Sequence, residues 1–377
     1  AAQLFAGAMM LYPKWYDPFD DCLCSFETAA QTLSASARAW RDDHAGWNAH
    51  GMRLWKRKPL QAFFGRYAPV TFSKTTGPRP QMAWAGKATP DQKAQGITRV
   101  EDGFLRSRGL GAELIAPLSL VLDDIGIYYD PTQPSKLEAL IEASPSLSEG
   151  ARARSQALIT ALIDQRLSKY NLGKPVLADL PKGRRILVPG QVEDDASIKC
   201  GTDGICTNLA LLEATRKANP AAIIIYKPHP DVEAGLRIGD VPEAQKFADV
   251  VASHADPITL IEQVDEVWTM TSLIGFEALL RGKRVTCLGT PFYAGWGLTD
   301  DRAMPNLRRV ATPDLIALVH AVLIDYPRYF DPKTGLPCPA EVVVARLASG
   351  DIPNAGRLNR ITAKLQGLFA SYAHIWR

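Results

Sequence analysis

The chain has 377 residues, of which 46% are hydrophobic and 22% charged, and its formal net charge is +3. This composition is typical of a globular protein of about two domains, and the charge is too small to indicate a nucleic-acid partner. The six cysteines form no CxxC pair and accompany no histidine cluster, which argues against a zinc site or a disulfide framework. Residues 1–10 lack the features of a secretory signal and no stretch of about 18 apolar residues occurs, so we expect a cytoplasmic protein, either soluble or peripheral at the inner membrane.

Two distant segments of the chain match without gaps. Residues 12–33 read YPKWYDPFDDCLCSFETAAQTL, and residues 326–347 read YPRYFDPKTGLPCPAEVVVARL. Internal repeats usually mark repeated structural units. We therefore interpret residues 1–35 as the tail of a preceding module or a linker, which implies a tandem N-terminal module in a longer protein. The alternative is that two similar amphipathic hairpins serve packing only.

The first block of the chain mixes helical patterns with short strand patterns. Helices are expected at 36–66, 134–143 and 151–168, strands at 69–73, 82–86 and the start of 97–111, and a hairpin at 119–130.

The second block alternates helices with nearly continuous apolar strands such as ILVPG, AAIIIY, EVWTM and RVTCLG. Such strands indicate a parallel sheet that is covered on both faces. We predict an α/β protein of GT-B-like plan, with two Rossmann-like domains facing a cleft. The expected division is an N-terminal domain (36–175), a C-terminal domain (176–325), and a tail with helices that cross back to the first domain (326–377).

Polar clusters follow the apolar strands of the second block, where open α/β sheets bind ligands. YKPHPD brings together Lys227 and His229, a pair that suits a phosphate, although a histidine can also simply cap a turn. TMTSLIGFEALLRGK (269–283) leads hydroxyl groups into a helix start, which is a phosphate site in principle. Glu277 lies one to two turns further and could accept both hydroxyls of a ribose; the alternative is an ordinary serine cap with a surface glutamate.

Two further clusters carry aromatic and acidic side chains. PFYAGWGLTDD (291–301) indicates either a loop that closes on a ligand or a packed turn. VEDD places three carboxylates, at 193–195, after a buried strand, where they could act as acid, base or nucleophile or form a solvated loop. Glu101, Asp102 and Arg106 follow a strand of the first block. Carboxylates on both sides of a cleft are the arrangement that glycosyl transfer needs.

Several long motifs resemble the bacterial capsule polysaccharide β-Kdo transferases of the KpsC/LipA type. They span roughly residues 50–347 and include RVEDGFLRSRGLGAELIAPLSLVLDDIGIYYDPTQPSKLE, LSKYNLG, ILVPGQVEDDASI, YKPHPDV, TMTSLIGFEALLRGKRVTCLGTPFYAGWGLT and DYPRYFDP. Members of that family often carry two tandem modules, which make β-(2→4) and β-(2→7) linkages, and VPGQVEDDASI is most similar to the second. The resemblance implies CMP-β-Kdo as donor, a β-Kdo-terminated acceptor on phosphatidylglycerol, and a role in building the poly-Kdo linker of a Gram-negative capsule.

The resemblance also implies a retaining mechanism, because donor and product are both β. Double displacement through a covalent glycosyl-enzyme achieves retention most simply. The family's D-x-S pattern makes Asp195, two residues before Ser197, the expected nucleophile, with Asp194 as the alternative. Glu101, or else Asp102, is expected to exchange a proton with the acceptor hydroxyl.

The resemblance makes 36–175 the acceptor-side domain and 176–325 the CMP-sugar-binding domain. The implied donor contacts lie in the same motifs. Lys227 and His229 would hold the CMP phosphate and help it leave, Thr271 and Ser272 would bind the same phosphate, and Glu277 would bind the ribose. Further expected contacts are Gln191, Ser197, Arg106 and Lys169, of which the last two are assigned to the Kdo carboxylate from charge alone. CMP leaves with one phosphate and no DxD motif stands in the usual place, so we expect neither a cofactor nor a metal.

Two other functions stay open from the sequence. One is a transferase of the same fold that uses another CMP-keto-sugar such as CMP-sialic acid, and the other is a non-catalytic glycan-binding module. The basic segment 356–377 has apolar residues at helical spacing. It is expected to pack back onto the first domain, with an interfacial membrane helix as the alternative.

Overall fold

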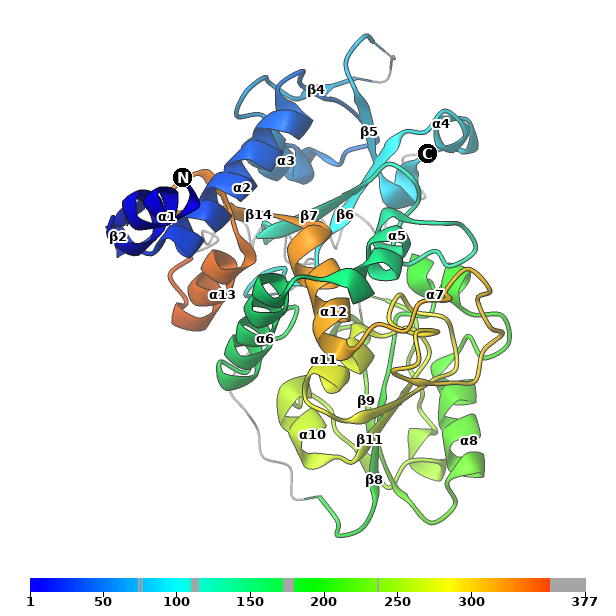
Figure 1. Ribbon diagram of the computed structural model, residues 1–377. Coiled ribbons are helices and arrows are strands. Elements are labelled where there is room, and N and C mark those ends of the chain that lie inside the picture. Colours follow the sequence, from blue (N-terminus) through cyan, green and yellow to red (C-terminus); the bar gives the residue numbers. More distant parts are fainter. Residues whose placement is uncertain (74, 76, 110–114, 172–179, 236, 353–377) are drawn as a thin grey trace. The chain divides into compact units, whose positions relative to one another are not determined.

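The computed structural model describes residues 1–352 except 74, 76, 110–114, 172–179 and 236 (Figure 1). Within these residues the chain forms two units. Unit 1 contains residues 1–122 and 326–352, and unit 2 contains residues 123–325. None of the helices in this part of the chain combines the length and the hydropathy that a membrane crossing requires.

Unit 2 is built on a six-stranded sheet in which every neighbouring pair is parallel. Its strands are β8 (Arg185–Pro189), β9 (Ile223–Lys227), β10 (Val250–Val251), β11 (Glu266–Thr269), β12 (Arg284–Cys287) and β13 (Asp300–Asp301). Successive residues of β8, from Ile186 to Val188, are all fully buried, so both faces of the sheet are covered. The predicted apolar strands of the second block are therefore confirmed.

The strand order in this sheet is β10-β9-β8-β11-β12-β13. Counted from the first strand of the unit, this is the order 3-2-1-4-5-6 of the Rossmann fold. All strands stay parallel, but the order in which they are added to the sheet reverses between strands 1 and 4. The reversal lies between β8 and β11. Loops leaving the carboxyl ends of these two strands diverge to opposite faces of the sheet, and ligands of this fold bind in the crevice between them.

The α-helices of unit 2 begin at side-chain caps. Ser135, Ser148, Thr207, Asp256, Ser272 and Asp314 each accept a hydrogen bond from a backbone N–H of the first turn, which compensates donors that have no partner inside the helix. The elements are α5 (Lys136–Ala143), η4 (Ser144–Ser146), α6 (Glu149–Asp164), α7 (Ala196–Gly201), α8 (Asn208–Ala218), α9 (Pro230–Glu233), η5 (Ala244–Lys246), α10 (Pro257–Gln263), α11 (Leu273–Leu280), α12 (Leu315–Val319) and η6 (His320–Asp325).

Unit 1 contains a seven-stranded sheet of order β15-β14-β7-β6-β5-β3-β4. The strands are β3 (Asn48–His50), β4 (Thr71–Phe72), β5 (Gln81–Trp84), β6 (Thr98–Asp102), β7 (Ser119–Asp123), β14 (Pro327–Asp331) and β15 (Leu336–Cys338). β4, β3, β5 and β6 pair in parallel, whereas β14 returns late in the chain and pairs antiparallel to β7 and to β15. A separate hairpin joins β1 (Trp15–Asp17) to β2 (Cys22–Cys24).

The helices of unit 1 are mostly short. They are α1 (Ala2–Phe5), η1 (Ala6–Leu11), α2 (Phe26–Asp43), α3 (Leu54–Phe64), η2 (Ala85–Lys87), α4 (Pro90–Ala94) and α13 (Ala340–Ser349). Figure 1 shows the blue α2 beside the orange β14, and α2 also packs against β15, so segments from both ends of the chain meet in this unit. A buried cluster that includes Leu60, Phe64, Met82 and Val100 joins α3 to the sheet.

Two predictions for the first block are wrong. The expected helix at 36–66 is divided into α2 and α3 by the strand β3, which lies between Gly46 and Gly51, both at positive φ. The expected hairpin at 119–130 is the single strand β7 followed by a turn. Asp123 ends this strand because its carboxylate accepts hydrogen bonds from the N–H groups of Ile125 and Gly126 (3.0 and 2.7 Å).

The two units divide the chain by packing rather than by sequence. α5 and α6 pack against α12 and η6, so residues 123–167 lie with unit 2. The predicted boundary between residues 175 and 176 falls outside the described residues, as does the basic segment 356–377.

Candidate functional site

The carboxyl ends of β8, β9 and β11 form one edge of the unit 2 sheet, here called the β8–β9–β11 edge. Gln191 lies at its centre and is buried. Its side-chain oxygen accepts hydrogen bonds from the N–H of Thr271 (3.0 Å) and the hydroxyl of Thr269 (3.2 Å), and its amide nitrogen donates to the Thr271 hydroxyl (2.9 Å). This amide therefore ties the loop after β8 to the loop after β11, and the structure gives Gln191 a positioning role.

Asn208, which the sequence analysis did not select, holds the backbone of Gln191. Its side chain accepts from the N–H of Gln191 and donates to the carbonyl oxygens of Gln191 and Gly239, all at 2.8 Å. A Cβ at Gly239 would stand 2.6 Å from the Gln191 oxygen, so glycine is required there. The available signal was an asparagine at the first position of α8.

The three carboxylates after β8 point to three different partners. Glu193 accepts from the N–H of Asn208 (2.8 Å), and the exposed Asp194 pairs with the guanidinium of Arg237 (2.8 Å). Asp195 caps α7 and accepts from the N–H of Ser197 at 3.4 Å. Separation onto different partners relieves the repulsion among adjacent anions. Asp195 is half-buried, and among the described residues its carboxylate accepts only this one long hydrogen bond.

Lys227 and His229 lie at the end of β9. The buried Lys227 donates from Nζ to the carbonyl oxygen of Pro228 (3.1 Å), and burial lowers its pKa. Nδ1 of His229 accepts from the N–H of Asp231 (3.1 Å), so in the neutral ring the proton is on Nε2. Burial, with the cations Lys227, Lys169 and Arg237 nearby, lowers the pKa of His229 to about 4.

These values describe an electropositive site. His229 is neutral near pH 7 and offers an N–H donor, while the cations around it favour an anion. Phosphate at this edge would satisfy the Nε2–H of His229 and lower the cost of charge on Lys227. The predicted pairing of Lys227 with His229 is thus compatible with the geometry of unit 2, and the charge of Lys169, predicted for a different contact, also acts on His229.

Thr271 and Ser272 lead from β11 into α11. The hydroxyl of Ser272 accepts from the N–H of Ile274 (3.2 Å), and the Thr269 hydroxyl accepts from the N–H of Ser272 (3.2 Å). Ser272 therefore caps α11 at the point where the strand order of the sheet reverses. This places the first turn of an eight-residue helix, with its partial positive charge, at the β8–β9–β11 edge.

Glu277 lies within α11 and is buried. Its carboxylate accepts from the backbone N–H of Lys169 (2.9 Å), and the guanidinium of Arg281, which follows the last residue of α11, donates to the carbonyl oxygen of Leu167 (3.2 Å). Burial raises the pKa of Glu277 to about 7, against the opposing effects of the Lys169 hydrogen bond and the Arg281 charge. The Lys169 segment is therefore held on α11 through its backbone, while its Nζ lies over the ring of Tyr170.

The aromatic loop after β12 is a packed turn. Tyr293 and Trp296 are fully buried, and the guanidinium of Arg309 donates to the carbonyl oxygens of Pro291 and Ala294 (both 2.6 Å). Of the two interpretations that the sequence left open, the structure shows the packed turn.

A second group of predicted residues lies in unit 1, at the end of β6. Arg106 is buried, and its guanidinium donates to Asp102 (2.8 Å), to the hydroxyl of Ser107 (2.8 Å) and to the carbonyl oxygen of Ile115 (3.1 Å). The side chain of Glu101 accepts from the N–H of Asp102 (3.0 Å). The observed role of Arg106 is to hold Asp102, and its donors are engaged inside the protein.

Sequence reasoning missed Lys56, which lies beside these carboxylates. Its Nζ lies over the ring of Trp84, and burial lowers its pKa to about 8 against the opposing charges of Asp102 and Glu101. Both aromatic and charged side chains line a small pocket here, formed by Trp55, Lys56, Pro59, Leu60, Trp84, Asp102, Pro117 and Leu120. The expected helix at 36–66 contained this lysine, but its pattern gave no sign that the side chain turns inward.

Two α/β sheets in one chain, one of them with the strand order of the Rossmann fold, are the elements of a GT-B-like fold. The family model described as "Capsule polysaccharide biosynthesis protein" matches residues 77–174 and 152–329. The chain therefore belongs to the capsule polysaccharide biosynthesis family, and within it to the glycosyltransferases of the KpsC/LipA type. The resemblance seen in the sequence and the predicted fold class are both confirmed.

Curated relatives support this membership. The capsule polysaccharide modification protein LipA of Neisseria meningitidis is 41% identical over 350 residues, which are 88% of this chain and 49% of LipA. The lipopolysaccharide-processing protein LpsZ of Rhizobium meliloti is 41% identical over 326 residues, 79% of this chain and 73% of LpsZ. The chain spans about half the length of the LipA proteins that it matches.

Solved structures of KpsC from Thermosulfurimonas dismutans are also similar. Its β Kdo 2,7 transferase is 36% identical, with a TM-score of 0.66, over 81% of this chain and 99% of that one. Its β Kdo 2,4 transferase is 33% identical, with a TM-score of 0.73, over 81% of this chain and 98% of that one.

Proposed function

We propose that this chain is a retaining β-Kdo transferase module. It moves Kdo from CMP-β-Kdo to a β-Kdo-terminated lipid-linked acceptor and contributes to the poly-Kdo linker of capsular polysaccharide. The observation that carries the proposal is the electropositive β8–β9–β11 edge around Lys227 and His229, in a chain whose solved relatives are named Kdo transferases.

The proposed linkage is β-(2→7). It rests on the motif VPGQVEDDASI and on the identity of 36% with the β Kdo 2,7 transferase against 33% with the β Kdo 2,4 transferase. The TM-scores favour the other neighbour, 0.73 against 0.66. NMR of the product distinguishes the two linkages directly.

The donor would bind along the β8–β9–β11 edge. The single phosphate of CMP would accept from Nε2–H of His229 and from Nζ of Lys227, near the cap formed by Thr271 and Ser272. An ionised Glu277 would accept the ribose hydroxyls. Because side-chain donors and the helix start neutralise this one phosphate, we propose that transfer needs no metal or other cofactor.

Transfer would proceed in two displacements at the anomeric carbon of Kdo. In the first, an oxygen of Asp195 forms a bond to that carbon as the bond to the CMP phosphate breaks. In the second, the acceptor oxygen replaces Asp195 as Glu101 takes the hydroxyl proton, so two inversions give retention. Asp195 is favoured as nucleophile because Asp194 is paired with the guanidinium of Arg237, which an attack by Asp194 would have to displace. For the same reason Glu101 is favoured as base, since Asp102 is paired with Arg106.

The partners and the location follow from the same proposal. The acceptor is lipid-linked, so the protein would work in the cytoplasm or peripherally at the inner membrane. A tandem N-terminal transferase module would precede this one in the full-length protein, in line with the 49% of LipA that the chain matches.

Intact-mass spectrometry beside a transfer assay tests the function. Wild type, Asp195→Asn and Asp194→Asn are incubated with CMP-Kdo generated in place, with and without a β-Kdo-terminated acceptor. We expect a Kdo-sized mass gain mapping to residues 193–198 in wild type without acceptor, transfer by Asp194→Asn, and a loss of at least about 10³-fold in Asp195→Asn.

Each other outcome changes the proposal in a defined way. Full transfer by Asp195→Asn would move the nucleophile to another residue, and an α-linked product would remove the retaining mechanism. Turnover with CMP-sialic acid but not with CMP-Kdo would replace the donor. Glycan binding without turnover of any CMP-sugar would leave a non-catalytic module.

A further inference from the structure

The two repeated segments fold into the same motif, a hairpin followed by a helix. In the first copy Trp15 pairs with Cys24 and Asp17 with Cys22, and the corresponding pairs in the second copy are Tyr329 with Cys338 and Asp331 with Leu336. Both turns have the same length, and their last residues, Asp21 and Gly335, share a positive φ (52° and 71°). The repeat in the sequence is therefore a repeat in structure, residue for residue.

The copies differ in what lies on the outer edge of the first strand. In the second copy this edge is paired, because β14 lies antiparallel to β7 and the N–H of Phe330 donates to the carbonyl oxygen of Leu118 (3.1 Å). In the first copy, β1 pairs only with β2 among the described residues. Because register and turn length agree, the N–H of Tyr16, the counterpart of Phe330, points to the open edge of β1.

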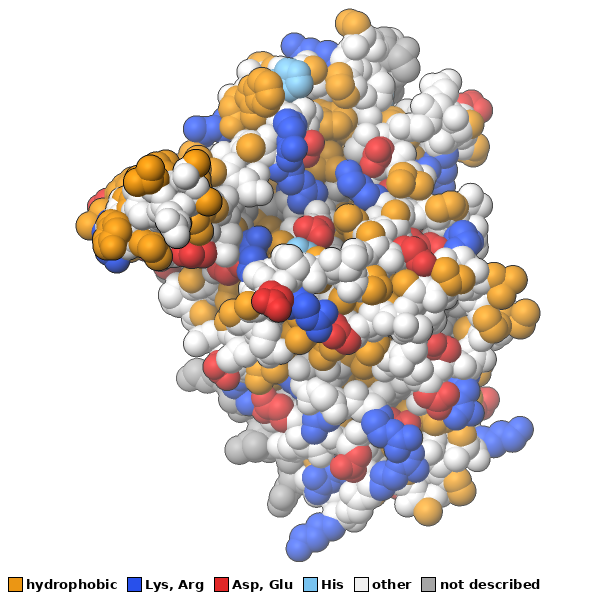
Figure 2. Space-filling model, viewed as in Figure 1, with side chains coloured by type: hydrophobic (Ala, Val, Ile, Leu, Met, Phe, Trp, Pro, Cys, Tyr) orange, Lys and Arg blue, Asp and Glu red, His pale blue; other side chains and the backbone are white. Residues whose placement is uncertain are grey.

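Burial differs in the same way. Tyr326 and Leu347 of the second copy are 0% and 2% exposed, whereas their counterparts Tyr12 and Leu33 are 83% and 62% exposed. The same N-terminal segment carries further exposed apolar side chains: Leu4, Phe5, Leu11, Tyr16, Leu23 and Trp40. Figure 2 shows this segment as a dense group of hydrophobic atoms at the left of the molecule. A contiguous apolar surface of this kind marks an interaction site.

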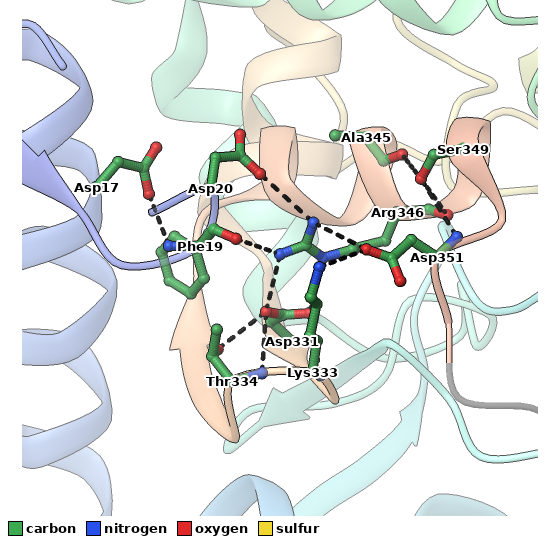
Figure 3. Close-up of polar contacts among 10 residues, drawn as sticks. All are labelled: Asp17, Phe19, Asp20, Asp331, Lys333, Thr334, Ala345, Arg346, Ser349 and Asp351. Atoms are coloured by element: carbon green, nitrogen blue, oxygen red, sulfur yellow. Dashed lines mark hydrogen bonds and ion pairs between the residues drawn. The ribbon is translucent and has the colours of Figure 1, made fainter. Parts of the chain in front are cut away.

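The first copy is nevertheless fixed to unit 1 by its other side (Figure 3). The buried guanidinium of Arg346, on α13, binds Asp331 of its own copy (3.1 Å) and also reaches the carbonyl oxygen of Phe19 (2.6 Å) and Asp20 (3.4 Å). Buried Arg328 pairs with Asp43 on α2 (2.7 Å). Because buried ion pairs break at high cost, the exposed face has a defined orientation relative to the unit 1 sheet.

We infer that the open edge of β1 and the apolar face around Tyr12 and Leu33 form the docking surface for a preceding module of the same fold. The edge strand of that module that corresponds to β7 pairs antiparallel with β1 and accepts the N–H of Tyr16. Residues 1–33 then complete the sheet of the preceding module as β14, β15 and α13 complete unit 1. The two copies of the motif, locked together through Arg346, form the junction between modules.

The occupant follows from three observations. The second copy shows which surface this motif buries, namely a unit 1 sheet at β7. The chain matches only about half of LipA, which leaves room for another module. The Arg346 contacts make the junction continuous with an interface that already exists in unit 1. The inference rests on the tandem arrangement proposed above.

Hydrogen exchange on the natural full-length protein and on the 377-residue chain tests the docking surface. We expect the amide of Tyr16 to exchange at least about tenfold more slowly in the full-length protein, while the amide of Phe330 is equally protected in both. Equal exchange at Tyr16 in the two proteins would overturn the inference, as would a full-length protein with no preceding module. Protection at Tyr16 in a self-associated 377-residue chain would assign the surface to a second copy.

A substitution pair provides the second measurement. Leu33→Asp should leave the melting temperature of the 377-residue chain unchanged, because Leu33 is exposed there, and should lower that of the full-length protein by several degrees. Leu307→Asp is the control, since Leu307 is 88% exposed in unit 2 and should be neutral in both. Leu33→Asp that is neutral in both proteins would refute burial at the junction.

Neither measurement depends on the donor. A protein that transfers Kdo but leaves Tyr16 unprotected would refute the junction alone. A protected Tyr16 in a protein that uses no CMP-Kdo would refute the proposed function alone.

Discussion

Replacing Glu277 by glutamine tests whether this buried carboxyl group retains a proton in the folded protein. Glu277 lies within α11, where its side chain accepts the N–H of Lys169 (2.9 Å). Burial raises its pKa from 4.5 to about 7, although that hydrogen bond and the charge of Arg281 oppose the effect. Glutamine keeps the shape and the acceptor oxygen of the side chain but cannot ionise.

The sign and the size of the effect follow from linkage. Between pH 4.5 and about 7 the folded protein holds a proton that the unfolded chain has released, so stability falls as the pH rises through this window. At about 1.4 kcal/mol for each pKa unit, the cost reaches about 3 kcal/mol above pH 7 and is absent below pH 4.5. Glu277→Gln removes this dependence.

Urea unfolding of both proteins at pH 4.5 and pH 8 measures the effect. The free energy of unfolding of Glu277→Gln minus that of wild type should increase by about 3 kcal/mol between the two pH values. Glu213→Gln, on the exposed face of α8, is the control and should show no such change. A Glu277→Gln difference that is the same at both pH values would refute the raised pKa of Glu277.

Three further predictions concern the site. His229→Ala should lower kcat about 10²-fold in initial-rate assays because it removes the Nε2–H donor, while His229→Gln should retain more activity; equal rates in all three proteins would exclude a role at the phosphate. Arg106→Met should lower the free energy of unfolding by about 3 kcal/mol in urea, because Asp102 loses its ion-pair partner, and a change below about 1 kcal/mol would contradict this. EDTA should leave the transfer rate unchanged, and a loss that added Mg²⁺ restores would contradict the metal-independent proposal.

The parts of the fold that could be predicted are those set by apolar runs. β8, β9 and β11 were predictable because each is a short buried run, and the position of the β8–β9–β11 edge followed because parallel strands place their carboxyl ends together. β3 was missed because its sequence, NAH, is polar. Asn48 and His50 are buried there because the side-chain oxygen of Gln81 bonds to both (2.9 and 2.6 Å), and no local pattern reveals that partner.

The candidate site shows the same limit. Sequence grouped Glu193, Asp194 and Asp195 correctly after a strand, but their directions depend on Asn208 and Arg237, which lie on later elements. Because these contacts are set by tertiary structure, spacing alone could not rank the three carboxylates. Arg106 shows the same limit. Its charge suggested a contact with the substrate, but its guanidinium donates to nearby groups of the same chain segment, residues 102–115.

The electrostatics of the β8–β9–β11 edge link stability to the proposed function. Burial displaces each central group toward its neutral form, since it lowers the pKa of Lys227 and of His229 and raises that of Glu277. A bound CMP would oppose the effect of burial on the pKa of Lys227 and of Glu277. A phosphate favours the charged form of the lysine, and ribose hydroxyls favour the ionised form of the glutamate. Glu277→Gln should therefore stabilise the free protein at pH 8 and weaken CMP binding in the same experiment. A variant that gains stability and binds CMP as tightly as wild type would place the ribose elsewhere, while leaving the raised pKa of Glu277 intact.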